Sequence, residues 1–392
     1  EIPATGHTEE VIPGKAATCT ATGLTEGKKC SVCGEILIAQ EEIPALGHTP
    51  GEAVREDTET GYDMVVCCAL CGTELSREFF ADPVEEPKVV MHTMNVSLES
   101  EIQMIYTVEI PAELAESGAK VVLTKEGGYG TVTKVFEGAD LAACKTGEPD
   151  CYAVKIGVAS GEMNRPITVE VFDAEGTAQT LYLRSGTELG TSAEKTVVDY
   201  VEAVLNNPSN SAEKKELAKA LLVYGGCAQV HFRVDPEYPA YAELGIVPDL
   251  SGVTAQTVAD YTNSQTNTDM GVKASSITTF VDSNIYIRLY LTVEGEADDY
   301  TIALTTPNGI KEIEIVSKDG RYYVDIPDIA SGYIDYPYSI TVSKGEQTNV
   351  ITTGVLSYVR SVLRNSSNSA SKQDLAKALY LYNQAANVFF GR

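Results

Sequence analysis

The chain has no tryptophan, only four histidines, and fewer basic than acidic residues. Lysine and arginine total 29 against 56 acidic residues, which gives a formal net charge of −27 over 392 residues. That balance argues against nucleic acids and anionic membrane surfaces as partners, because both attract basic patches. Since no run of about 18 apolar residues occurs, we also expect no membrane insertion. The missing tryptophan weakens a carbohydrate-binding interpretation, because the indole offers the broadest stacking face.

Motifs of the common enzyme classes are missing as well. The sequence contains no G-x-S-x-G, no P-loop, no G-x-G-x-x-G opening a helix, no H-E-x-x-H and no EF-hand loop. Acidic residues are plentiful, yet no pair is set apart by its spacing, so surface acidity explains them. We therefore expect a protein that is not an enzyme. A glycoside hydrolase that uses two facing carboxylates is the weakest alternative.

One stretch of the chain occurs twice. Residues 200–232 align without a gap with residues 358–390, and more than half of the aligned positions are identical. Each copy reads as two helices joined by an Asn/Ser loop, with apolar residues at the spacing of one helical face. An internal duplication of this kind indicates two copies of one structural unit.

Two local details of the first copy lead to further predictions. Thr191 and Glu194 have the spacing of a capping box, which places the start of the shorter helix there. Gly225 and Gly226 lie inside the longer helix, where each costs about 1 kcal/mol relative to alanine. Because the second copy has other residues at both positions, the glycines are predicted to be dispensable for the fold.

Strand-like runs precede each helical pair. They are rich in Val, Ile, Thr and Tyr and are separated by Gly, Pro and Asp turns. The order of strands followed by two helices predicts an α+β fold, in which two duplicated antiparallel sheet or sandwich modules each end in a two-helix hairpin. The first module carries extra residues that predict one more hairpin near residues 174–189.

The composition changes along the chain and suggests domain boundaries. Residues 1–46 and 47–87 form two small Cys-rich repeats, which we expect to be zinc-ribbon-like. The α+β modules are predicted at 88–240 and 276–392, with a linker at 241–275. Since the chain opens in the middle of a motif and has no initiating methionine, we expect it to be a piece of a longer protein with further domains.

The Cys-rich repeats need a cross-link, either a bound metal ion or disulfide bonds, because they contain too few apolar residues to fold around a core. In the first repeat, Cys30 and Cys33 form a CxxC pair that can bind one metal ion. Cys19 is the expected third ligand, and His7 or His48 the fourth. Three thiolates and one imidazole make an ordinary structural zinc site.

The second repeat departs from this pattern, since an aspartate aligns with Cys19. The ligands expected there are Cys68 and Cys71, one of Cys67 or Asp57, and His48 or His92. Disulfide bonds remain an open alternative for both repeats, because exported chains meet oxidising conditions. Free thiols are a third possibility, and zinc is favoured.

Two other groups of residues are candidate sites. Cys144 and Cys151 bracket a segment with a glycine and a proline, which suits a disulfide at a hairpin tip. Exposed tyrosines on strands or loops can form a protein-binding hot spot or stack on sugars. The candidate binding residues are Tyr322, Tyr323, Tyr333, Tyr336 and Tyr338; the competing interpretation is that they line the core.

The pattern of His-Thr, Ala-Thr-Cys-Thr, Cys-Ser-Val-Cys-Gly and Ile-Pro-Ala-Leu-Gly-His-Thr at residues 7–49 resembles a short repeat of large cell-surface proteins. Those adhesin-like proteins belong to anaerobic Gram-positive bacteria. The segment LAKALLVYGGCAQ also looks like part of a module seen in such proteins. The resemblance implies an extracellular protein, either secreted or attached to the cell surface, and it implies no catalytic residues.

These observations favour a non-enzymatic bacterial surface protein. In this hypothesis the Cys-rich repeats are stapled spacers, and the paired α+β modules bind a host protein, such as an immunoglobulin, or a host glycan. The alternative is a purely structural stalk that presents another domain.

Overall fold

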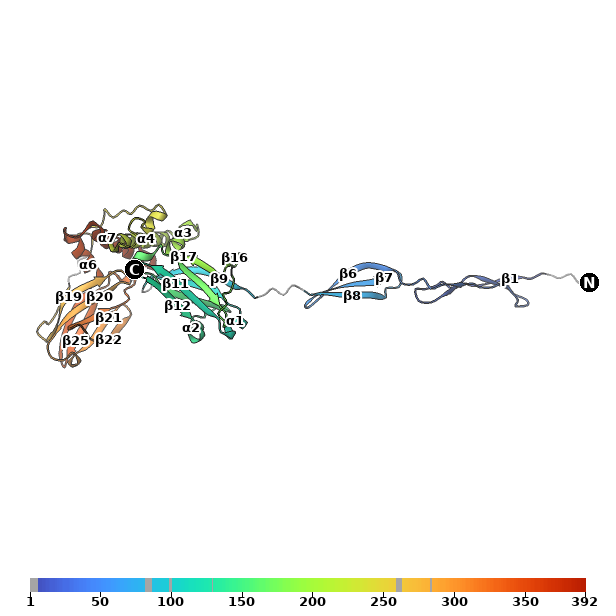
Figure 1. Cartoon of the computed structure of the whole chain (residues 1–392), viewed down its shortest axis with the longest axis horizontal. Coiled ribbons are helices and arrows are strands. Elements are labelled where there is room, and N and C mark those ends of the chain that lie inside the picture. The colour runs from blue at the N-terminus through green and yellow to red at the C-terminus, as the bar shows by residue number, and fades with distance from the viewer. Residues whose placement is uncertain (1–5, 82–86, 99–100, 129, 259–262, 283) are drawn as a thin grey trace, which may run out of the picture. The chain divides into compact units, whose positions relative to one another are not determined.

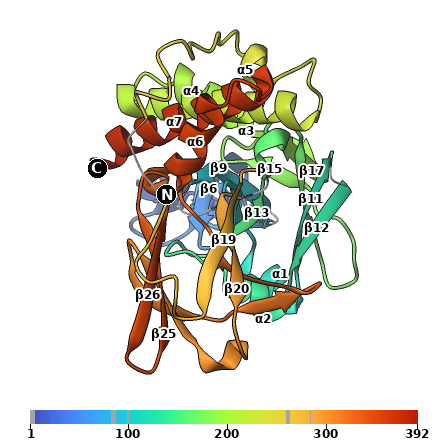
Figure 2. The same ribbon diagram turned by 90° about the vertical axis from the view of Figure 1, so that its left-hand side faces the viewer.

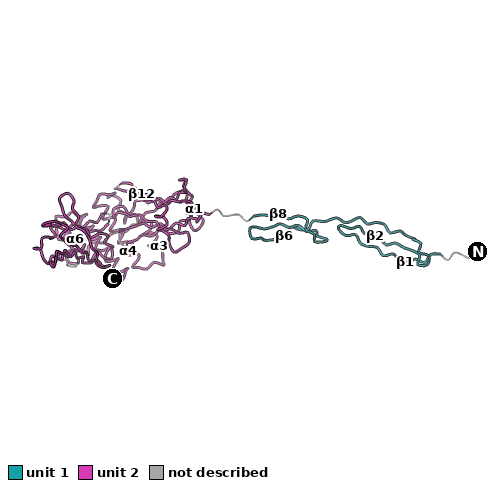
Figure 3. The backbone as a smooth tube through the Cα atoms, turned by 90° about the horizontal axis from the view of Figure 1, so that it is seen from below, with its two compact units in different colours: residues 1–86 teal, residues 87–392 magenta. Residues whose placement is uncertain are grey.

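The structure is a computed structural model that describes residues 6–81, 87–98, 101–128, 130–258, 263–282 and 284–392. The chain divides into two compact units, Glu1–Glu86 and Pro87–Arg392, which Figure 3 shows in different colours. The fold is mixed α+β, with mostly antiparallel sheets and a few helices. The predicted fold class is confirmed at this level.

Unit 1 consists of short antiparallel strands (Figure 1). The strands are β1 (Glu9–Ile12), β2 (Gly23–Leu24), β3 (Gly27–Cys30), β4 (Ile36–Ile38), β5 (Glu42–Ile43), β6 (Pro50–Thr58), β7 (Gly61–Cys68) and β8 (Glu74–Ala81). They form sheets of order β1-β3-β4, β2-β5 and β6-β7-β8. Strands β3 and β7 each end on a cysteine of a CxxC pair, so the sheets position both pairs at strand ends.

Very few side chains of unit 1 are buried. Among its described residues, the buried apolar side chains are Cys19, Cys30, Val65 and Cys68. Larger apolar side chains such as Val32 are exposed instead. Because three of the four buried side chains are cysteines, the interior of unit 1 consists largely of sulfur rather than hydrocarbon.

The first half of unit 2 is a pair of facing β-sheets. Its strands are β9 (Val89–Ser97), β10 (Gln103–Glu109), β11 (Lys120–Gly127), β12 (Gly130–Phe136), β13 (Cys151–Gly157), β14 (Ile167–Phe172), β15 (Leu181–Leu183), β16 (Glu188–Gly190) and β17 (Ser192–Lys195). One sheet has the order β13-β10-β9-β15-β16 and the other β12-β11-β14-β17. Buried Tyr106 of β10 donates its hydroxyl proton to the Ile167 carbonyl of β14 at 3.0 Å, which joins the two sheets. The hairpin predicted near residues 174–189 is formed by β15 and β16.

The second half of unit 2 is another pair of sheets. Its strands are β18 (Ser264–Gln265), β19 (Val272–Phe280), β20 (Tyr286–Val293), β21 (Thr301–Thr306), β22 (Gly309–Ile313), β23 (Val316–Lys318), β24 (Arg321–Ile326), β25 (Tyr338–Lys344) and β26 (Gln347–Thr353). Their orders are β18-β26-β25-β21-β22 and β19-β20-β24-β23. Buried Asn349 of β26 donates to the Val272 carbonyl of β19 at 2.9 Å and ties one sheet to the other.

The long helices are α3 (Val197–Asn206), α4 (Ala212–Phe232), α6 (Val355–Arg364) and α7 (Ala370–Phe390). The short ones are α1 (Ala112–Ser117), α2 (Gly138–Ala142) and α5 (Ala240–Glu243), with 3-10 turns η1 (Ser160–Glu162), η2 (Ala297–Asp299) and η3 (Ser331–Tyr333). Helices α3, α4, α5, α6 and α7 lie together at one end of both sheet pairs, whereas α1 and α2 lie at the other end of the first pair (Figure 2). Helix α4 packs directly on α7, so apolar side chains of both halves share one core. Among the described residues, no helix has the length and apolar character needed to cross a membrane.

The loops α3–α4 and α6–α7 make the same hydrogen bonds. Ser211 and Ser369 each accept a hydrogen bond on Oγ from the amide three residues later, at 3.2 Å in both loops. Asn210 and Asn368 each donate to a carbonyl six residues earlier, at 3.0 and 2.9 Å. These bonds satisfy backbone groups at the end of one helix and the start of the next.

The predicted capping box lies at the wrong residues. Strand β17 (Ser192–Lys195) begins directly after Thr191 and contains Glu194, and α3 begins later, after Thr196. The box is formed by Thr196 and Asp199: the Thr196 Oγ1 accepts from the Asp199 amide at 3.0 Å, and the Asp199 carboxylate accepts from the Thr196 amide at 2.7 Å. A threonine followed three residues later by an acidic residue occurs twice here, at Thr191/Glu194 and at Thr196/Asp199. Residues 192–195 pair with β14 as a strand, so only the second pair can cap the helix.

The prediction that Gly225 and Gly226 are dispensable is wrong for the first copy. A Cβ on Gly225 would lie 2.3 Å from the Met163 sulfur, and one on Gly226 would lie 2.3 Å from the Tyr241 ring. Both glycines therefore permit close packing against α4. In the second copy, Asn383 is buried and donates to a backbone carbonyl instead.

The predicted linker, residues 241–275, packs onto unit 2. Its Val253 and Val258 are buried. Just before the linker, the Ala240 amide donates to the buried side chain of Gln229 at 2.7 Å. The described residues up to 258 cover the helices (Figure 2), whereas β18 and the start of β19 belong to the sheets of the second half, so the segment is not a free spacer.

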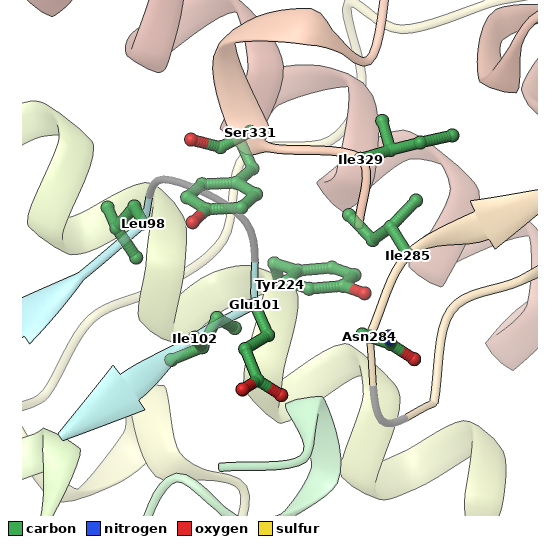
Figure 4. Close-up of a pocket in the computed structure, with 9 residues that line it drawn as sticks. Leu98, Glu101, Ile102, Tyr224, Asn284, Ile285, Ile329 and Ser331 are labelled. Atoms are coloured by element: carbon green, nitrogen blue, oxygen red, sulfur yellow. The ribbon is translucent and has the colours of Figure 1, made fainter. Parts of the chain in front are cut away.

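A small cavity lies where the two halves of unit 2 meet (Figure 4). It is lined by Leu98, Glu101, Ile102, Tyr224, Asn284, Ile285, Ile329, Ser331 and Tyr382. Its volume of about 10 Å³ leaves room for about one water molecule. It is a packing remnant between the halves and not a ligand pocket.

Candidate metal centre

Both CxxC pairs of unit 1 adopt the same tight turn, here called the first knuckle (residues 30–34) and the second knuckle (residues 68–72). In the first, the Gly34 amide donates to the Cys30 carbonyl at 2.9 Å; in the second, the Gly72 amide donates to the Cys68 carbonyl at 2.8 Å. The two glycines have φ values of +77° and +76°, which glycine adopts without strain. Each turn folds its two cysteines back toward one point.

Four ligand atoms converge at the second knuckle. Cys19, His48, Cys68 and Cys71 place their sulfur or ring nitrogen atoms within 4.8 Å of one another, and we call these residues the closed set. The Cys19 and Cys68 sulfurs are 3.8 Å apart, and the Cys71 sulfur lies 3.4 Å from His48 Nδ1. Tetrahedral zinc with ordinary bond lengths requires about 3.8 Å between two sulfurs and about 3.5 Å between sulfur and nitrogen. Both distances agree with these values, so the closed set could hold a metal ion.

Backbone hydrogen bonds hold the closed set in place. The segment before His48 pairs with the Cys19 loop, because the Gly47 amide donates to the Cys19 carbonyl at 3.0 Å. The segment after His48 pairs with the knuckle, because the Ala69 amide donates to the Thr49 carbonyl at 2.9 Å. His48 is thus positioned between a loop of the first repeat and a turn of the second.

The pKa shifts differ among the four ligands: Cys68 and Cys71 are shifted toward the thiolate that binds a metal ion, whereas Cys19 and His48 are shifted toward their protonated forms. The Leu70 amide and His48 hold the pKa of Cys68 at about 5, so this sulfur is a thiolate at neutral pH. Hydrogen bonds from the Thr73 hydroxyl and amide lower the pKa of Cys71, while Cys68 and Cys71 raise the pKa of His48. Burial, reinforced by the neighbouring cysteines, raises the pKa of Cys19 to about 11. A metal ion would displace a proton from Cys19 and compete with a proton at His48, since the ligands are the thiolate and the neutral imidazole.

Three ligands converge at the first knuckle, and we call them the open set: His7, Cys30 and Cys33. The Cys33 sulfur lies 3.5 Å from His7 Nδ1. The other ring nitrogen, Nε2, lies 3.5 Å from the Glu35 carboxylate. A carboxylate on the far nitrogen of a metal-binding histidine orients the ring. Amides of Cys33 and Val32 lower the pKa of Cys30 to about 6.

The structure corrects the predicted ligand sets. Cys19 does not join Cys30 and Cys33; it completes the site of the following repeat. The alternatives for the second repeat lie elsewhere, with Asp57 bound to Arg55 at 2.7 Å and Cys67 outside the closed set. The CxxC spacing fixes only two ligands, and the third depends on which loop packs against the knuckle.

The predicted alternative ligand His92 belongs to unit 2, where it meets two other residues. Its Nε2 lies 2.5 Å from the Glu109 carboxylate and its Nδ1 lies 3.7 Å from the Cys151 sulfur. The Arg184 guanidinium donates to the same Nδ1 at 2.7 Å, so a cation already occupies that side of the ring. Burial raises the pKa of Cys151, which keeps this thiol protonated. No local sequence pattern indicates this cluster, because it depends on two strand pairings: Glu109 of β10 lies opposite Cys151 of β13, and His92 comes from β9, which pairs with β10 on its other side.

Cys144 and Cys151 are separate thiols in the structure, as are the other cysteines. The Ala153 amide donates to the Cys144 carbonyl at 2.8 Å, and the Thr146 amide donates to the Cys151 carbonyl at 2.9 Å. The two cysteines are thus displaced by two residues along the pairing rather than directly opposite. Such diagonal positions are about 7–8 Å apart, so the predicted disulfide requires a local shift of the backbone.

The five candidate tyrosines separate into different environments. Tyr338 is buried, and Tyr322 and Tyr336 pack against the core. Tyr333 lies under the Arg392 guanidinium, at 3.7 Å from the ring centroid. Tyr323 stands on the other face of β24, where it pairs with Tyr290 of β20. The rings of Tyr333, Tyr336 and Tyr338 contact one another in sequence, at 6.5 and 5.1 Å between centroids, whereas Tyr323 belongs to an aromatic surface on the other face of β24.

Comparison with protein-family models and with curated proteins found no match for this chain.

Proposed function

We propose that the chain is a non-enzymatic extracellular surface protein in which structural zinc staples the Cys-rich repeats and the paired α+β modules present a binding surface. The observation that carries the proposal is the closed set. Four protein ligands at tetrahedral spacing leave no coordination position for a substrate, which is typical of structural and not catalytic zinc. Unit 1 has almost no apolar core, so metal binding would supply most of its folding free energy.

The duplication is part of the proposal. Helices α3 and α4 match α6 and α7 in length, and their connecting loops make the same hydrogen bonds. The strand order β12-β11-β14-β17 of the first half corresponds to β22-β21-β25-β26 of the second. These similarities support two copies of one module that are packed together through α4 and α7.

A binding role rests on one surface of the second module, here called the aromatic face. It comprises Phe280, Tyr286, Arg288, Tyr290, Tyr323 and Asp325. Arg288 lies 4.0 Å from the centre of the Tyr323 ring and bonds Asp325 through two contacts of 2.7 Å. The rings of Phe280 and Tyr286 stack at 4.3 Å.

Tyrosine and arginine side chains gathered on one sheet face favour a protein partner, since these residue types are enriched in protein-binding hot spots. We infer that the partner is a host protein, with immunoglobulin as the first to screen. The double variant Tyr290→Ala/Tyr323→Ala should weaken binding at least tenfold, whereas Tyr238→Ala, which changes an exposed tyrosine elsewhere, should not. Binding of a glycan alone, or of nothing in a panel of host proteins and glycans, would replace this proposal with the glycan-binding or the stalk function.

Zinc analysis tests the structural part. The intact chain, purified under mild conditions, should carry tightly bound zinc, and a strong chelator should expose the thiols of the closed set. Circular dichroism should retain the helical signal of unit 2 after chelation, while unit 1 becomes sensitive to protease. A metal-free chain with protected cysteines and few free thiols would overturn the zinc proposal in favour of disulfide staples.

A further inference from the structure

The two knuckles of unit 1 are alike, but their ligand sets differ by one member. Each has a histidine from a Gly-His-Thr segment and two cysteines from a CxxC turn. The closed set adds buried Cys19, while among the described residues no fourth cysteine, histidine or carboxylate joins the open set within the same distance. Zinc bound there would keep one position for another ligand, because structural sites have four.

The closed set shows the direction in which the ligand is supplied. Cys19 belongs to the first repeat, but it serves the knuckle of the second. The site of the second repeat is therefore completed by a cysteine of the preceding repeat. By the same rule, the open set should receive its thiol from a repeat that precedes it in an array.

The second repeat fits this direction. Its residue at the position of Cys19 is Asp57, an exposed side chain bound to Arg55. The second repeat thus has no thiol at the position of Cys19, and the chain after it continues into unit 2 and not into another knuckle. It has the character of a terminal repeat, which in repeat proteins commonly differs from the others.

The backbone beside the open set is already shaped for a Cys19-type loop. Gly6 and Gly47 each precede the histidine, and their φ values are +69° and +72°. In the closed set the Gly47 amide donates to the carbonyl of Cys19. The Gly6 amide, in the equivalent place, has no backbone partner among the described residues. His7 and Cys33 are exposed, so a loop from outside can reach them.

We propose that His7, Cys30 and Cys33 take their fourth metal ligand from the Cys19-type loop of a further copy of this repeat. Each zinc ion would then join two consecutive repeats, and the sites would run along an array. This inference rests on the proposed zinc function and adds the identity of the missing ligand. The further repeat would supply two groups: a thiolate that binds the metal ion and a backbone carbonyl that accepts a hydrogen bond from the Gly6 amide.

The test adds one repeat to the full chain. A second copy of residues 7–47 is inserted directly before His7. The inserted counterpart of Cys19 then has the same sequence separation from His7 that Cys19 has from His48. Zinc retention is then measured against increasing chelator, and cobalt-loaded chains are examined for thiolate-to-metal absorption. The parent chain should hold one chelator-resistant ion, at the closed set, and the extended chain two. The affinity of the former open set should rise on the order of 100-fold or more, as expected for a tethered ligand.

A matched control separates ligation from a general effect of added chain. In the extended chain, the inserted counterpart of Cys19 is changed to serine. This change should return the number of chelator-resistant ions to one and remove the added cobalt–thiolate absorption. If the extended chain holds no more resistant ions than the parent, or if the serine control holds as many as the extended chain, the inference is wrong. If the parent chain retains no resistant ion, the zinc function itself fails, which is a different result.

Discussion

The ring of Tyr224 on α4 stacks on the ring of Tyr382 on α7, with centroids 5.4 Å apart and planes 7° from parallel. The two tyrosines occupy equivalent positions of the duplicated stretch, and both are buried. Tyr224 also donates its hydroxyl proton to the Val281 carbonyl of the second half at 2.9 Å. The pair therefore joins the two halves of unit 2 at the centre of their contact.

Replacing Tyr224 tests how strongly the halves depend on each other. Tyr224→Ala should lower the free energy of unfolding by about 3–5 kcal/mol, because it removes a large buried ring. Tyr224→Phe keeps the stack and should lower it by only about 1 kcal/mol, the typical net value of one hydrogen bond. Urea unfolding followed by circular dichroism measures both, and Tyr238→Ala is the exposed control. Equal effects of the alanine and phenylalanine variants would contradict the role given to the stack.

Alkaline pH should destabilise unit 2 through the same residues. Burial raises the pKa of Tyr224 and of Tyr382 above the ordinary value of 10.0. In the unfolded chain both hydroxyls ionise near pH 10, whereas in the folded chain they stay protonated. The stabilisation is therefore complete below about pH 10 and declines as the pH rises further. Urea midpoints at pH 8 and pH 11 should differ in that direction, and Tyr224→Phe should reduce the difference. A midpoint independent of pH would refute the assignment.

Single cysteine substitutions should separate the two candidate ligand arrangements of unit 1. Cys19→Ser should abolish tight zinc binding at the second knuckle and leave the first knuckle unchanged. Cys67→Ser should leave zinc binding intact, since Cys67 lies outside the closed set. Cobalt absorption reports the number of thiolates around each ion. The reverse pattern, in which only Cys67→Ser removes the metal, would show that the ligands are the ones the sequence first suggested.

The close approach of Met163 to Gly225 predicts an asymmetry between glycines. Gly225→Ala should destabilise unit 2 by about 1–3 kcal/mol through overpacking, although alanine itself favours a helix by up to about 1 kcal/mol. Gly147→Ala, in a loop, is the control for the added methyl group alone, because its Cβ would meet no atom within 4 Å. Thermal unfolding of both variants gives the comparison. A Gly225→Ala variant that is more stable than the parent would show that the Met163 side chain moves away easily.

Local patterns in the sequence predicted the elements well. The β-branched runs, the apolar stripes and the Asn/Ser loops all depend on neighbours along the chain, and the structure places strands and helices there. Register between distant strands has no such local signal. It decides that Thr196 and not Thr191 begins α3, and it brings His92 next to Cys151.

In the candidate metal centre, too, the local part could be predicted from the sequence and the long-range part could not. The CxxC turns are local, so Cys68 and Cys71 were predicted as a pair. Cys19 is 49 residues from Cys68, and the contact between their sulfurs depends on how one repeat packs against the next. The spread of the five tyrosines over core and surface could not be predicted either, because alternate residues of a strand point to opposite faces.

The closed set also has a mechanical meaning. A metal ion that binds Cys19 together with the second knuckle shields the chain between them from a pulling force, because the load passes through the metal–sulfur bonds. The shielded segment is 49 residues long, as counted from Cys19 to Cys68. Fully extended, it would add about 160–180 Å to the reach of the protein. Losing the ion under tension would release that length. The availability of the metal would therefore determine the maximum end-to-end length that the chain reaches under load.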